Sequence, residues 1–470
     1  MTSCTITSAP GKVLVTGGYL VLEQAFWGCV VSTSSRFYTI IQAQSKPNHI
    51  SVHSPQFEQA DWTYVVTDDF KLKAVTLDST NKFVETALSF TLQLMVEKQG
   101  VRKVQEVLKS GLNITIVGDN DFYSQRPQLQ AKNLSNTAEA LASLDPFCST
   151  HATLATVHKT GLGSSAALIT SLVAGLLLHF GMIEDVTSEM SKRWIHNVAQ
   201  FIHCFAQGKV GSGFDVSSAV WGSHLYKRFN PAILKPIMDE QVDSKLLLDT
   251  LHADNTEWDN QVVPFKLPPG FDLVLADIDA GSHTPTLVSK VLNWKKSKSE
   301  EASLLWTELN ECNSKVEARF RNLIRLSEQS PEEYKSTIEW CSSRLFHQWS
   351  SAEDQVAVEL LGLHDEFNRV RSLLRRMGEL SDVPIEPKEQ TQLLEACMQV
   401  PGVVMAGVPG AGGYDAIFCI VISERAKRDV RALWKSWKEL SVGPLLSEAD
   451  SNGITSPQTN QIPGLSRFIL

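Results

Sequence analysis

The chain has 470 residues, and 43 lysines and arginines against 52 aspartates and glutamates give it a formal net charge of −9 at pH 7. Hydrophobic residues make up 43% of the chain and charged residues 20%, ordinary globular values that argue against a disordered or fibrous protein. The acidic balance argues against a nucleic-acid binder, because contact with a phosphate backbone needs a surplus of lysine and arginine. Length alone predicts two or three domains.

The eight cysteines are scattered and form no Cys-X-X-Cys pair, a pattern typical of free, buried thiols in a reducing compartment. No basic segment followed by an apolar segment opens the chain, so no signal peptide is expected. Residues 166–183 are uncharged at neutral pH and nearly long enough to span a bilayer, but their polar side chains and the preceding glycine-rich turn favour a buried helix. A cytoplasmic protein is therefore predicted.

Apolar periodicity predicts the elements of the first half of the chain. Strands are expected at residues 13–15, 20–22, 35–42, 112–117 and 154–157, and helices at 83–97, 164–180 and 186–206.

Composition shifts near Arg228, and prolines are frequent over residues 229–270. A strand is expected at 271–277 and a mostly helical stretch at 285–377. A helix at 388–398, a strand at 403–406, a glycine turn at 407–413, a strand at 415–422 and a helix at 424–438 follow. This order predicts an α+β protein with two domains, residues 1–225 and 226–470.

The glycine-rich segment Lys159-Thr-Gly-Leu-Gly-Ser-Ser-Ala-Ala167 leads into a predicted helix. Backbone N–H groups of such a turn, followed by a helix N-terminus, suit a bound phosphate, although an ordinary turn with serine caps has the same pattern. The segment also matches the dinucleotide pattern GxGxxA. That alternative is disfavoured because Glu184 and Asp185 precede a helix instead of ending a strand. No GxxxxGK[ST] motif and no protein-kinase motif set occurs.

Three further segments combine small residues with charge. Residues 9–19 (APGKVLVTGGY) place Lys12 on a strand beside a Gly-Gly turn. Residues 408–415 (VPGAGGYD) form a turn between two predicted strands, and residues 211–215 (GSGFD) place Asp215 after flexible backbone. Each alone also fits a surface lysine, a tight hairpin or a helix cap.

Together these segments resemble the three ordered motifs of the GHMP small-molecule kinases. APGKVLVTGGYLVLE (9–23) is similar to the first motif, KTGLGSSAALIT (159–170) to the second and GVPGAGGYDAIFCI (407–420) to the third. The resemblance implies the two-domain GHMP kinase fold: an N-terminal α/β domain that holds the first two motifs and a ferredoxin-like C-terminal domain with extra helices.

Within that family the chain resembles the eukaryotic, especially fungal, phosphomevalonate kinases. Mevalonate kinases and galactokinases typically have Gly-Glu-His where this chain has Gly17-Gly18-Tyr19, and the segments 119–126, 206–222 and 281–295 look like phosphomevalonate kinase. The resemblance implies transfer of the γ-phosphoryl group of Mg-ATP to the phosphate of (R)-5-phosphomevalonate, giving 5-diphosphomevalonate for isoprenoid and sterol synthesis. The expected partner is this small molecule, with no nucleic acid and no membrane, and the oligomeric state stays open.

The resemblance also implies residue roles. Lys12 and Asp215 match the catalytic residues, with Asp215 as the base. The nucleotide and its Mg²⁺ are expected on Gly161, Leu162, Gly163, Ser164, Ser165 and Ala166, with Ser165 as the metal ligand, and on Asn120 and Tyr123. Substrate contacts are expected from Lys12, Tyr19, Lys209, Ser212, Gly213, Ser282, Thr284, Gly410, Ala411 and Gly412.

The chain departs from the family pattern at one position. In mevalonate kinase a glutamate on the helix before the catalytic aspartate also binds Mg²⁺, and here that position falls at His203 or Cys204, neither a natural Mg²⁺ ligand. The ion is therefore expected on Ser165, phosphate oxygens and water. A zinc site at His196 and His203 is not expected, because neither has partners at ligand spacing.

The protonation state of the acceptor phosphate determines how much base catalysis Asp215 must provide. A phosphomonoester has its second pKa at about 6 and is mostly dianionic at pH 7, so little proton removal is needed. Asp215 is therefore expected chiefly to orient Lys12 and to take any remaining proton. Because both reactants are anions, Lys209 and an arginine such as Arg193 or Arg228 are expected to help Lys12 offset their charge.

Two alternatives remain open. The first is mevalonate kinase or another GHMP small-molecule kinase, which Gly18-Tyr19 and the missing metal glutamate disfavour. The second is a non-catalytic GHMP-fold protein that senses a metabolite, which the presence of Lys12, Ser165 and Asp215 disfavours.

Overall fold

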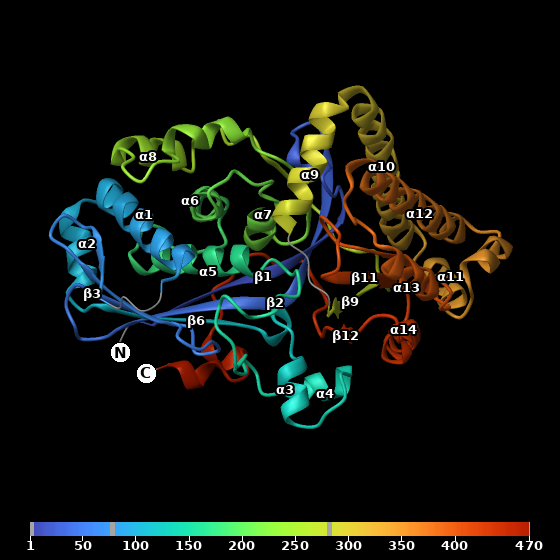
Figure 1. Ribbon diagram of the computed structural model, residues 1–470, viewed down its shortest axis with the longest axis horizontal. Coiled ribbons are helices and arrows are strands. Elements are labelled where there is room, and N and C mark those ends of the chain that lie inside the picture. The colour runs from blue at the N-terminus through green and yellow to red at the C-terminus, as the bar shows by residue number, and fades with distance from the viewer. Residues whose placement is uncertain (1–3, 76–79, 280–283, 470) are drawn as a thin grey trace.

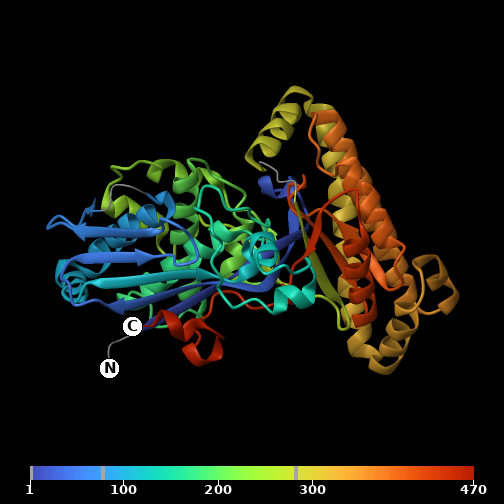
Figure 2. The ribbon, with the colours of Figure 1, turned by 60° about the horizontal axis from the view of Figure 1, so that its bottom comes forward.

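The computed structural model describes residues 4–75, 80–279 and 284–469. The chain forms two lobes, each built on its own sheet (Figures 1 and 2). In the described residues the first lobe has a nine-stranded sheet of order β5-β4-β3-β6-β2-β7-β8, with β1 and β13 also paired to β2. Its strands are β1 (Thr5–Thr16), β2 (Trp27–Ala43), β3 (His49–His53), β4 (Asp61–Val66), β5 (Leu72–Ala74), β6 (Leu112–Gly118), β7 (His224–Lys227), β8 (Gln261–Pro264) and β13 (Ala449–Asp450).

One face of this sheet carries most of the first lobe's helices (Figure 1). They are α1 (Lys82–Gln99), α2 (Val101–Leu108), α5 (Ser164–His179), α6 (Glu189–Gln207), α7 (Phe214–Trp221) and α8 (Ser244–Leu251). The short helices α3 (Arg126–Ala131) and α4 (Ala138–Ala142) lie on the opposite side. Helix α5 packs between β1, β2, α1, α6 and α7.

The uncharged stretch 166–183 thus forms a buried helix, α5, up to His179, and this helix buries residues such as Ile169, Leu172 and Leu177. Among the helices of residues 4–75, 80–279 and 284–469, none combines the length and the apolar character needed to cross a membrane.

The second lobe confirms the ferredoxin-like prediction. Its antiparallel sheet has the order β10-β11-β9-β12, and the chain order β9–α13–β10–β11–α14–β12 is the βαββαβ pattern. These elements are β9 (Asp272–Ile278), α13 (Lys388–Met398), β10 (Val403–Gly407), β11 (Ala416–Val421), α14 (Glu424–Ser436) and β12 (Val442–Pro444). Helices α13 and α14 cover one face of the sheet through Leu393, Val430 and Trp434.

Extra helices cover the other face of this sheet. They are α9 (Thr284–Ser297), α10 (Ser299–Gln329), α11 (Pro331–Ser342) and α12 (Gln355–Ser381), and Figure 2 shows the long pair α10 and α12 side by side. The ring of Phe367 in α12 packs on Phe418 of β11, with ring centroids 5.7 Å apart. Because helices cover both faces of the sheet, the alternate side chains of β11 are all buried, and its sequence is continuously apolar.

Two of the expected strands are wrong. Residues 20–22 form the 3-10 helix η1 (Leu20–Leu22), which starts after Tyr19 with φ of 64°. Residues 154–157 are a turn in which the N–H of Val157 donates to the carbonyl of Thr153. In both cases a short apolar run predicted a strand, but the backbone forms a local turn, which buries Leu20 and Val21 and leaves Leu154 and Val157 half-buried.

The strand pairing favours a division between the lobes later than residue 225. Strand β8 is hydrogen-bonded to β7, and α8 packs on α1 and α6 of the first lobe. We therefore propose that the passage to the second lobe follows Pro264.

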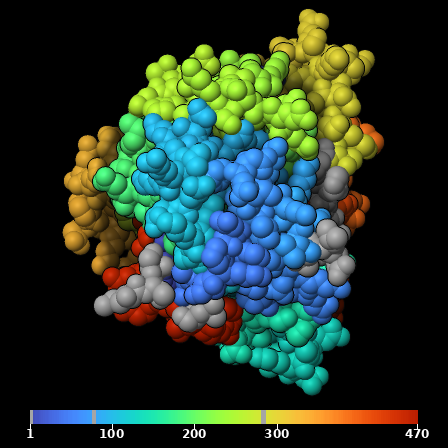
Figure 3. All heavy atoms as spheres, turned by 90° about the vertical axis from the view of Figure 1, so that its left-hand side faces the viewer, coloured from blue at the N-terminus to red at the C-terminus, as the bar shows by residue number. Residues whose placement is uncertain are grey.

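The C-terminal segment returns to the first lobe. Strand β13 pairs with β2, Thr455 bridges to Ser8, and the guanidinium of Arg36 donates to the carbonyl of Gly453. Figure 3 shows this C-terminal segment, in red, along the edge of the N-terminal strands. The last residues thus complete the first sheet instead of extending the second lobe.

The buried carboxyl group of Asp119, directly after β6, should make the free energy of unfolding depend on pH. Its carboxylate accepts the N–H of Arg36 at 2.8 Å, yet burial raises its pKa to about 7, against 3.8 ordinarily. The folded state therefore prefers the protonated acid, so its stability contribution is full below pH 3.8 and is lost as the pH rises to about 7. At pH 8 we expect the free energy of unfolding of Asp119→Asn to exceed that of the parent by on the order of 2 kcal/mol, so that the variant unfolds at a higher urea concentration. At pH 4 the two should coincide, and a constant difference at both pH values would contradict this account. The exposed Asp68→Asn is the control.

Candidate active site

Lys12 lies where the first two glycine-rich segments meet. A bulge in the β1–β2 pairing falls between Pro10 and Lys12 and turns the lysine out of the regular strand alternation. Its Nζ donates to the carbonyl of Gly161 at 3.0 Å, and its N–H donates to the carbonyl of Leu162 at 2.9 Å. Gly163 has φ of 80°, and a Cβ there would lie 3.0 Å from the Lys12 Cε. The loop therefore needs glycine where it wraps the lysine.

Two carboxylates act on this lysine. Burial lowers the pKa of the Lys12 ammonium, and the charges of Asp215 and Asp415 raise it. The ring centroid of Phe214 lies 5.5 Å from its Nζ. Asp215 comes from the start of α7 and Asp415 from the third glycine-rich segment. Lys12 is thus a cation shared by two carboxylates from distant segments, one of them more than 400 residues from the lysine in sequence.

The glycine loop leaves the start of α5 open. Gly161 and Gly163 both have positive φ, and the helix begins at Ser164 with no side-chain cap on its first N–H groups. Tyr123 lies beside the start of the loop, because it forms an isolated β-bridge with Lys159. Free amides at a helix N-terminus bind anions, so the loop can hold phosphate groups.

A buried histidine connects Ser165 to Asp215. The Nε2 of His203, on α6, lies 3.1 Å from the Ser165 Oγ and 3.9 Å from the Asp215 Oδ2. Burial lowers the pKa of His203, so its imidazole is neutral at pH 7, and its Nε2 can accept hydrogen bonds from the Ser165 hydroxyl and from the side-chain amide of Gln207, 2.9 Å away. That arrangement leaves lone pairs of the serine oxygen free.

The oxygen donors of this region fit Mg²⁺. They are the Ser165 hydroxyl and the Asp215 carboxylate, and within the described residues no group of three or more histidine, cysteine, aspartate or glutamate side chains gathers to form a metal site. Mg²⁺ commonly keeps several waters and takes one or two protein oxygens plus substrate phosphates. The residues therefore suit an ion that arrives with a nucleotide.

The third glycine-rich segment docks onto the first. The hydroxyl of Tyr19 donates to the carbonyl of Ala411 at 2.7 Å, and the N–H of Gly410 donates to the carbonyl of Leu14 at 3.2 Å. Gly18 has no space for a side chain, because a Cβ would overlap the carbonyl oxygen of Gly410. The second lobe thus contributes backbone directly beside Lys12.

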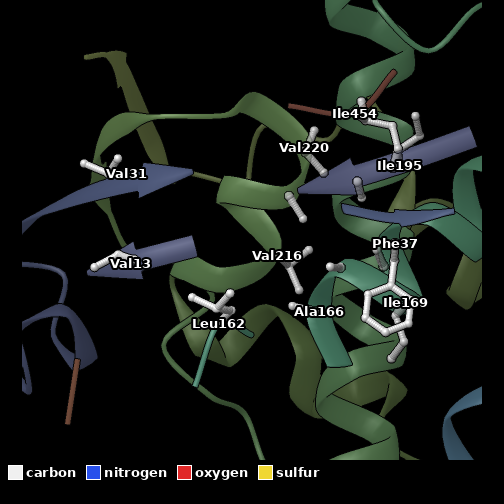
Figure 4. Close-up of a cluster of buried hydrophobic side chains, with 14 of the residues drawn as sticks. Val13, Val31, Phe37, Leu162, Ala166, Ile169, Ile195, Val216, Val220 and Ile454 are labelled. Atoms are coloured by element: carbon white, nitrogen blue, oxygen red, sulfur yellow. The ribbon is translucent and has the colours of Figure 1, made fainter. Parts of the chain in front are cut away.

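A shared core holds these segments in place. Val13, Leu162, Ala166 and Val216 are buried together, each next to or near a polar residue of the site (Figure 4). Ile454 of the C-terminal segment joins the same cluster. Neighbours along the chain thus anchor Lys12, the glycine loop and Asp215 against one another.

Family models match two stretches of the chain, GHMP kinases N terminal domain over residues 137–223 and GHMP kinases C terminal over residues 358–439. The peroxisomal phosphomevalonate kinase of Arabidopsis thaliana is 37% identical over 489 residues, which cover 96% of this chain and 95% of the relative. Phosphomevalonate kinase ERG8 of Gibberella zeae is 36% identical over 97% of both chains. The chain belongs to the phosphomevalonate kinase family.

Solved structures agree on the fold. A Lin0012 protein from Listeria innocua has a TM-score of 0.65 at 15% identity and covers 97% of this chain. Streptococcus pneumoniae phosphomevalonate kinase, in complex with phosphomevalonate and AMPPNP, has a TM-score of 0.58 at 14% identity and covers 95%. The GHMP kinase fold expected from the motifs is therefore confirmed. As a family member, the chain is an ATP-dependent kinase of a small molecule.

In this phosphomevalonate kinase family member, the carbonyls of Gly161 and Leu162 and the charge of Asp215 act on Lys12. Other expected residues have structural partners or a different setting. The side chain of Asn120 donates to the carbonyl of Asp145 at 2.9 Å and accepts the N–H of Cys148 at 3.0 Å. Lys209 is exposed at the end of α6. Ser282 lies outside the described residues, and Thr284 is the first residue of α9.

Three contributions were missed at the level of sequence. His203 was considered only as a metal ligand, whereas it bridges Ser165 and Asp215. Asp415 lies within the third motif, just after its glycine turn, a position that could have suggested its influence on Lys12. The third is an ionic link between the lobes, in which Arg126 donates to the carboxylate of Asp277.

That link also reaches the glycine loop. His158 immediately precedes the loop, and its Nε2 lies 3.3 Å from the Asp277 Oδ1. The bond to Asp277 raises the pKa of His158. Only the folded arrangement of β9 beside the loop reveals this contact, since nothing in the spacing of the residues indicates it.

The Tyr19 hydroxyl offers a specific test of the docking between motifs. We expect Tyr19→Phe to lower kcat/KM for the acceptor about tenfold, because the Ala411 carbonyl loses a donor of roughly 1.5 kcal/mol. Tyr334→Phe is the matched control, since that hydroxyl also donates to a backbone carbonyl, of Pro269 at 2.8 Å, away from Lys12. Steady-state kinetics with equal losses in both variants would count against a role for the docking.

Proposed function

We propose that the protein transfers the γ-phosphoryl group of Mg-ATP to the phosphate of (R)-5-phosphomevalonate, giving ADP and 5-diphosphomevalonate on the mevalonate route to isoprenoids and sterols. The observation that carries this proposal is the position of Lys12. One lysine lies against the phosphate-binding loop and within electrostatic range of Asp215 and Asp415. Phosphoryl transfer between two anions depends mainly on alignment and on such local positive charge.

On the nucleotide side, the loop Gly161–Ala166 and the start of α5 receive the phosphates, and Tyr123 supports the loop. Ser165 would hold the Mg²⁺ ion through its hydroxyl oxygen while the hydroxyl hydrogen-bonds to His203. When bound, the ion offsets negative charge on the β- and γ-phosphates. This assignment is supported by the open helix N-terminus and by the positive φ of both glycines.

On the acceptor side, Asp215 and Lys12 act on the phosphate of 5-phosphomevalonate. Lys12 draws the anionic acceptor and the transferred group together, while Asp215 keeps the lysine charged and takes any proton left on the acceptor. The carboxylate raises the pKa of Lys12, which is the direction this role needs. The remaining acceptor contacts are proposed from Tyr19, Lys209, Ser212, Gly213, Thr284 and the backbone of Gly410, Ala411 and Gly412.

The proposal is tested by ADP release from Mg-ATP with 5-phosphomevalonate and mevalonate assayed side by side. Turnover with the phosphorylated acceptor alone is expected. Turnover with mevalonate instead would overturn the acceptor assignment and favour a mevalonate kinase. ATP binding without turnover of either acceptor would favour a metabolite sensor.

Placement in the cytoplasm stays a prediction, because one relative at 37% identity is named as peroxisomal. Expression of the full chain with a fluorescent tag and organelle markers decides between the two compartments.

A further inference from the structure

Arg228 is a buried arginine behind the loop that carries Asp215. It follows β7 and is only 9% exposed. Its guanidinium donates to the carbonyls of Gly211 at 2.6 Å and Val210 at 3.2 Å, and also to the carbonyl of Leu22. Within the described residues no carboxylate lies within ion-pair distance of it, and its Nε has no hydrogen-bond partner. The charge of Glu23 and the ring of Phe229, whose centroid lies 5.9 Å from the Arg228 Cζ, also favour this cation. Burial nevertheless lowers its pKa, so its presence needs an explanation.

A second buried side chain continues this contact along the loop. The hydroxyl of Tyr226, on β7, donates to the carbonyl of Ser212 at 2.8 Å. Gly213 follows with φ of 85°, and a Cβ there would lie 2.8 Å from the same hydroxyl. Arg228 and Tyr226 therefore bond three successive carbonyls of the loop, and no larger residue fits at Gly213.

The orientation of these carbonyls fixes the other side of the loop. In a planar trans peptide the C=O and the following N–H point in opposite directions. Since the carbonyls of Gly211 and Ser212 point to Arg228 and Tyr226, the N–H groups of Ser212 and Gly213 point away from them. Two successive amides turned the same way suit an anionic ligand.

The same guanidinium connects two parts of the site. Leu22 ends η1, which begins after Tyr19, and Tyr19 holds the third motif through Ala411. On its other side Arg228 holds the loop that leads into α7 at Asp215. One buried residue thus fixes the distance between the docking of the third motif and the catalytic carboxylate.

We propose that Arg228 and Tyr226 are positioning residues for phosphoryl transfer: they fix the segment 210–213, with its amides turned toward the acceptor and Asp215 in place. Arg228 also supplies a positive charge, without a partner carboxylate, that the dianionic acceptor offsets on binding. This inference rests on the proposed function. It explains why a buried charge is retained where a neutral side chain would fold at lower cost.

The first test uses Arg228→Ala and guanidinium ion. We expect kcat to fall about 100-fold, because small misplacement of catalytic groups has effects of this size. KM for 5-phosphomevalonate should rise while KM for ATP stays within about twofold, and millimolar guanidinium chloride should restore part of kcat. Arg344→Ala is the control, since that guanidinium also donates to a backbone carbonyl, of Trp340 at 2.9 Å, in α11. It should keep kcat and show no response to guanidinium.

Two milder variants keep the test decisive if Arg228→Ala does not fold. Arg228→Lys keeps the charge but loses the fork that reaches several carbonyls, so kcat should still fall at least tenfold. Tyr226→Phe should lower kcat about tenfold with ATP affinity unchanged. Folded variants with parental kcat, or losses that only track the folded fraction measured by circular dichroism, would overturn the inference.

The ratio of the kcat of each variant to that of the parent is measured with whichever acceptor the parent phosphorylates. Failure of the parent to use 5-phosphomevalonate would therefore overturn the proposed function, while an unchanged ratio would overturn the role of Arg228 and Tyr226.

Discussion

Lys12→Ala should lower kcat about 1,000-fold while leaving the chain folded. The ammonium is the cation that the structure places against the phosphate loop, within range of Asp215 and Asp415. Two anionic reactants must approach each other in a protein whose net charge is already −9, so loss of this charge removes stabilisation that forms mainly in the transition state. KM for ATP should change far less than kcat. Rapid-quench measurement of a single turnover separates the chemical step from product release.

Lys103→Ala is the matched control. Its ammonium also reaches a glycine carbonyl, that of Gly181 at 3.3 Å, but it lies on α2 far from the motifs. This variant should turn over at the parental rate. A Lys12→Ala protein with a normal single-turnover rate would remove Lys12 from the mechanism.

Asp215→Asn should lose more activity at pH 6 than at pH 7.5. The second pKa of a phosphomonoester is near ~6, so at pH 6 about half of the acceptor still carries a proton and at pH 7.5 little does. We expect a loss on the order of 100-fold at pH 6, the low end for a general base, and a several-fold smaller loss at pH 7.5. The pH profile of kcat with saturating substrates measures the difference.

The same variant should move the alkaline limb of kcat/KM. The Asp215 carboxylate raises the pKa of Lys12, so its neutralisation lowers that pKa and the lysine loses its proton at lower pH. Asp243→Asn, which keeps an acceptor for the N–H of Leu246 at the start of α8, should leave both limbs in place. Equal losses at pH 6 and pH 7.5 would show that Asp215 does not remove a proton, and an unmoved alkaline limb would show that it does not support the charge of Lys12.

Regular elements with strong periodicity were predicted well from the sequence. The helix expected at residues 388–398 is α13, with the same bounds, and the one expected at 83–97 lies within α1. Short apolar runs failed, because an apolar run of three or four residues fits a local turn as well as a strand. Residues 20–22 form η1, in which the N–H of Val21 donates to the carbonyl of Gly17 and the N–H of Leu22 to that of Tyr19.

Some residues of the candidate site could be predicted from short sequence patterns, and others could not. Motif spacing was enough to nominate Lys12, the glycine loop and Asp215, because each needs a residue type that a short pattern reveals. The bridge at His203 and the carbonyl contacts of Arg228 join residues that are far apart in sequence. Their roles depend on which side-chain and backbone atoms face them in the folded chain, and neither composition nor spacing carries that information.

The central claim is that the phosphoryl acceptor is itself a phosphate. Phosphorus NMR of the product formed from ATP and 5-phosphomevalonate tests it directly. The account predicts a new pair of mutually coupled signals, apart from those of ADP and ATP, as two phosphorus atoms become joined through one oxygen. A product with two uncoupled phosphomonoester signals would mean that a hydroxyl of the substrate accepts the group, and it would contradict the account.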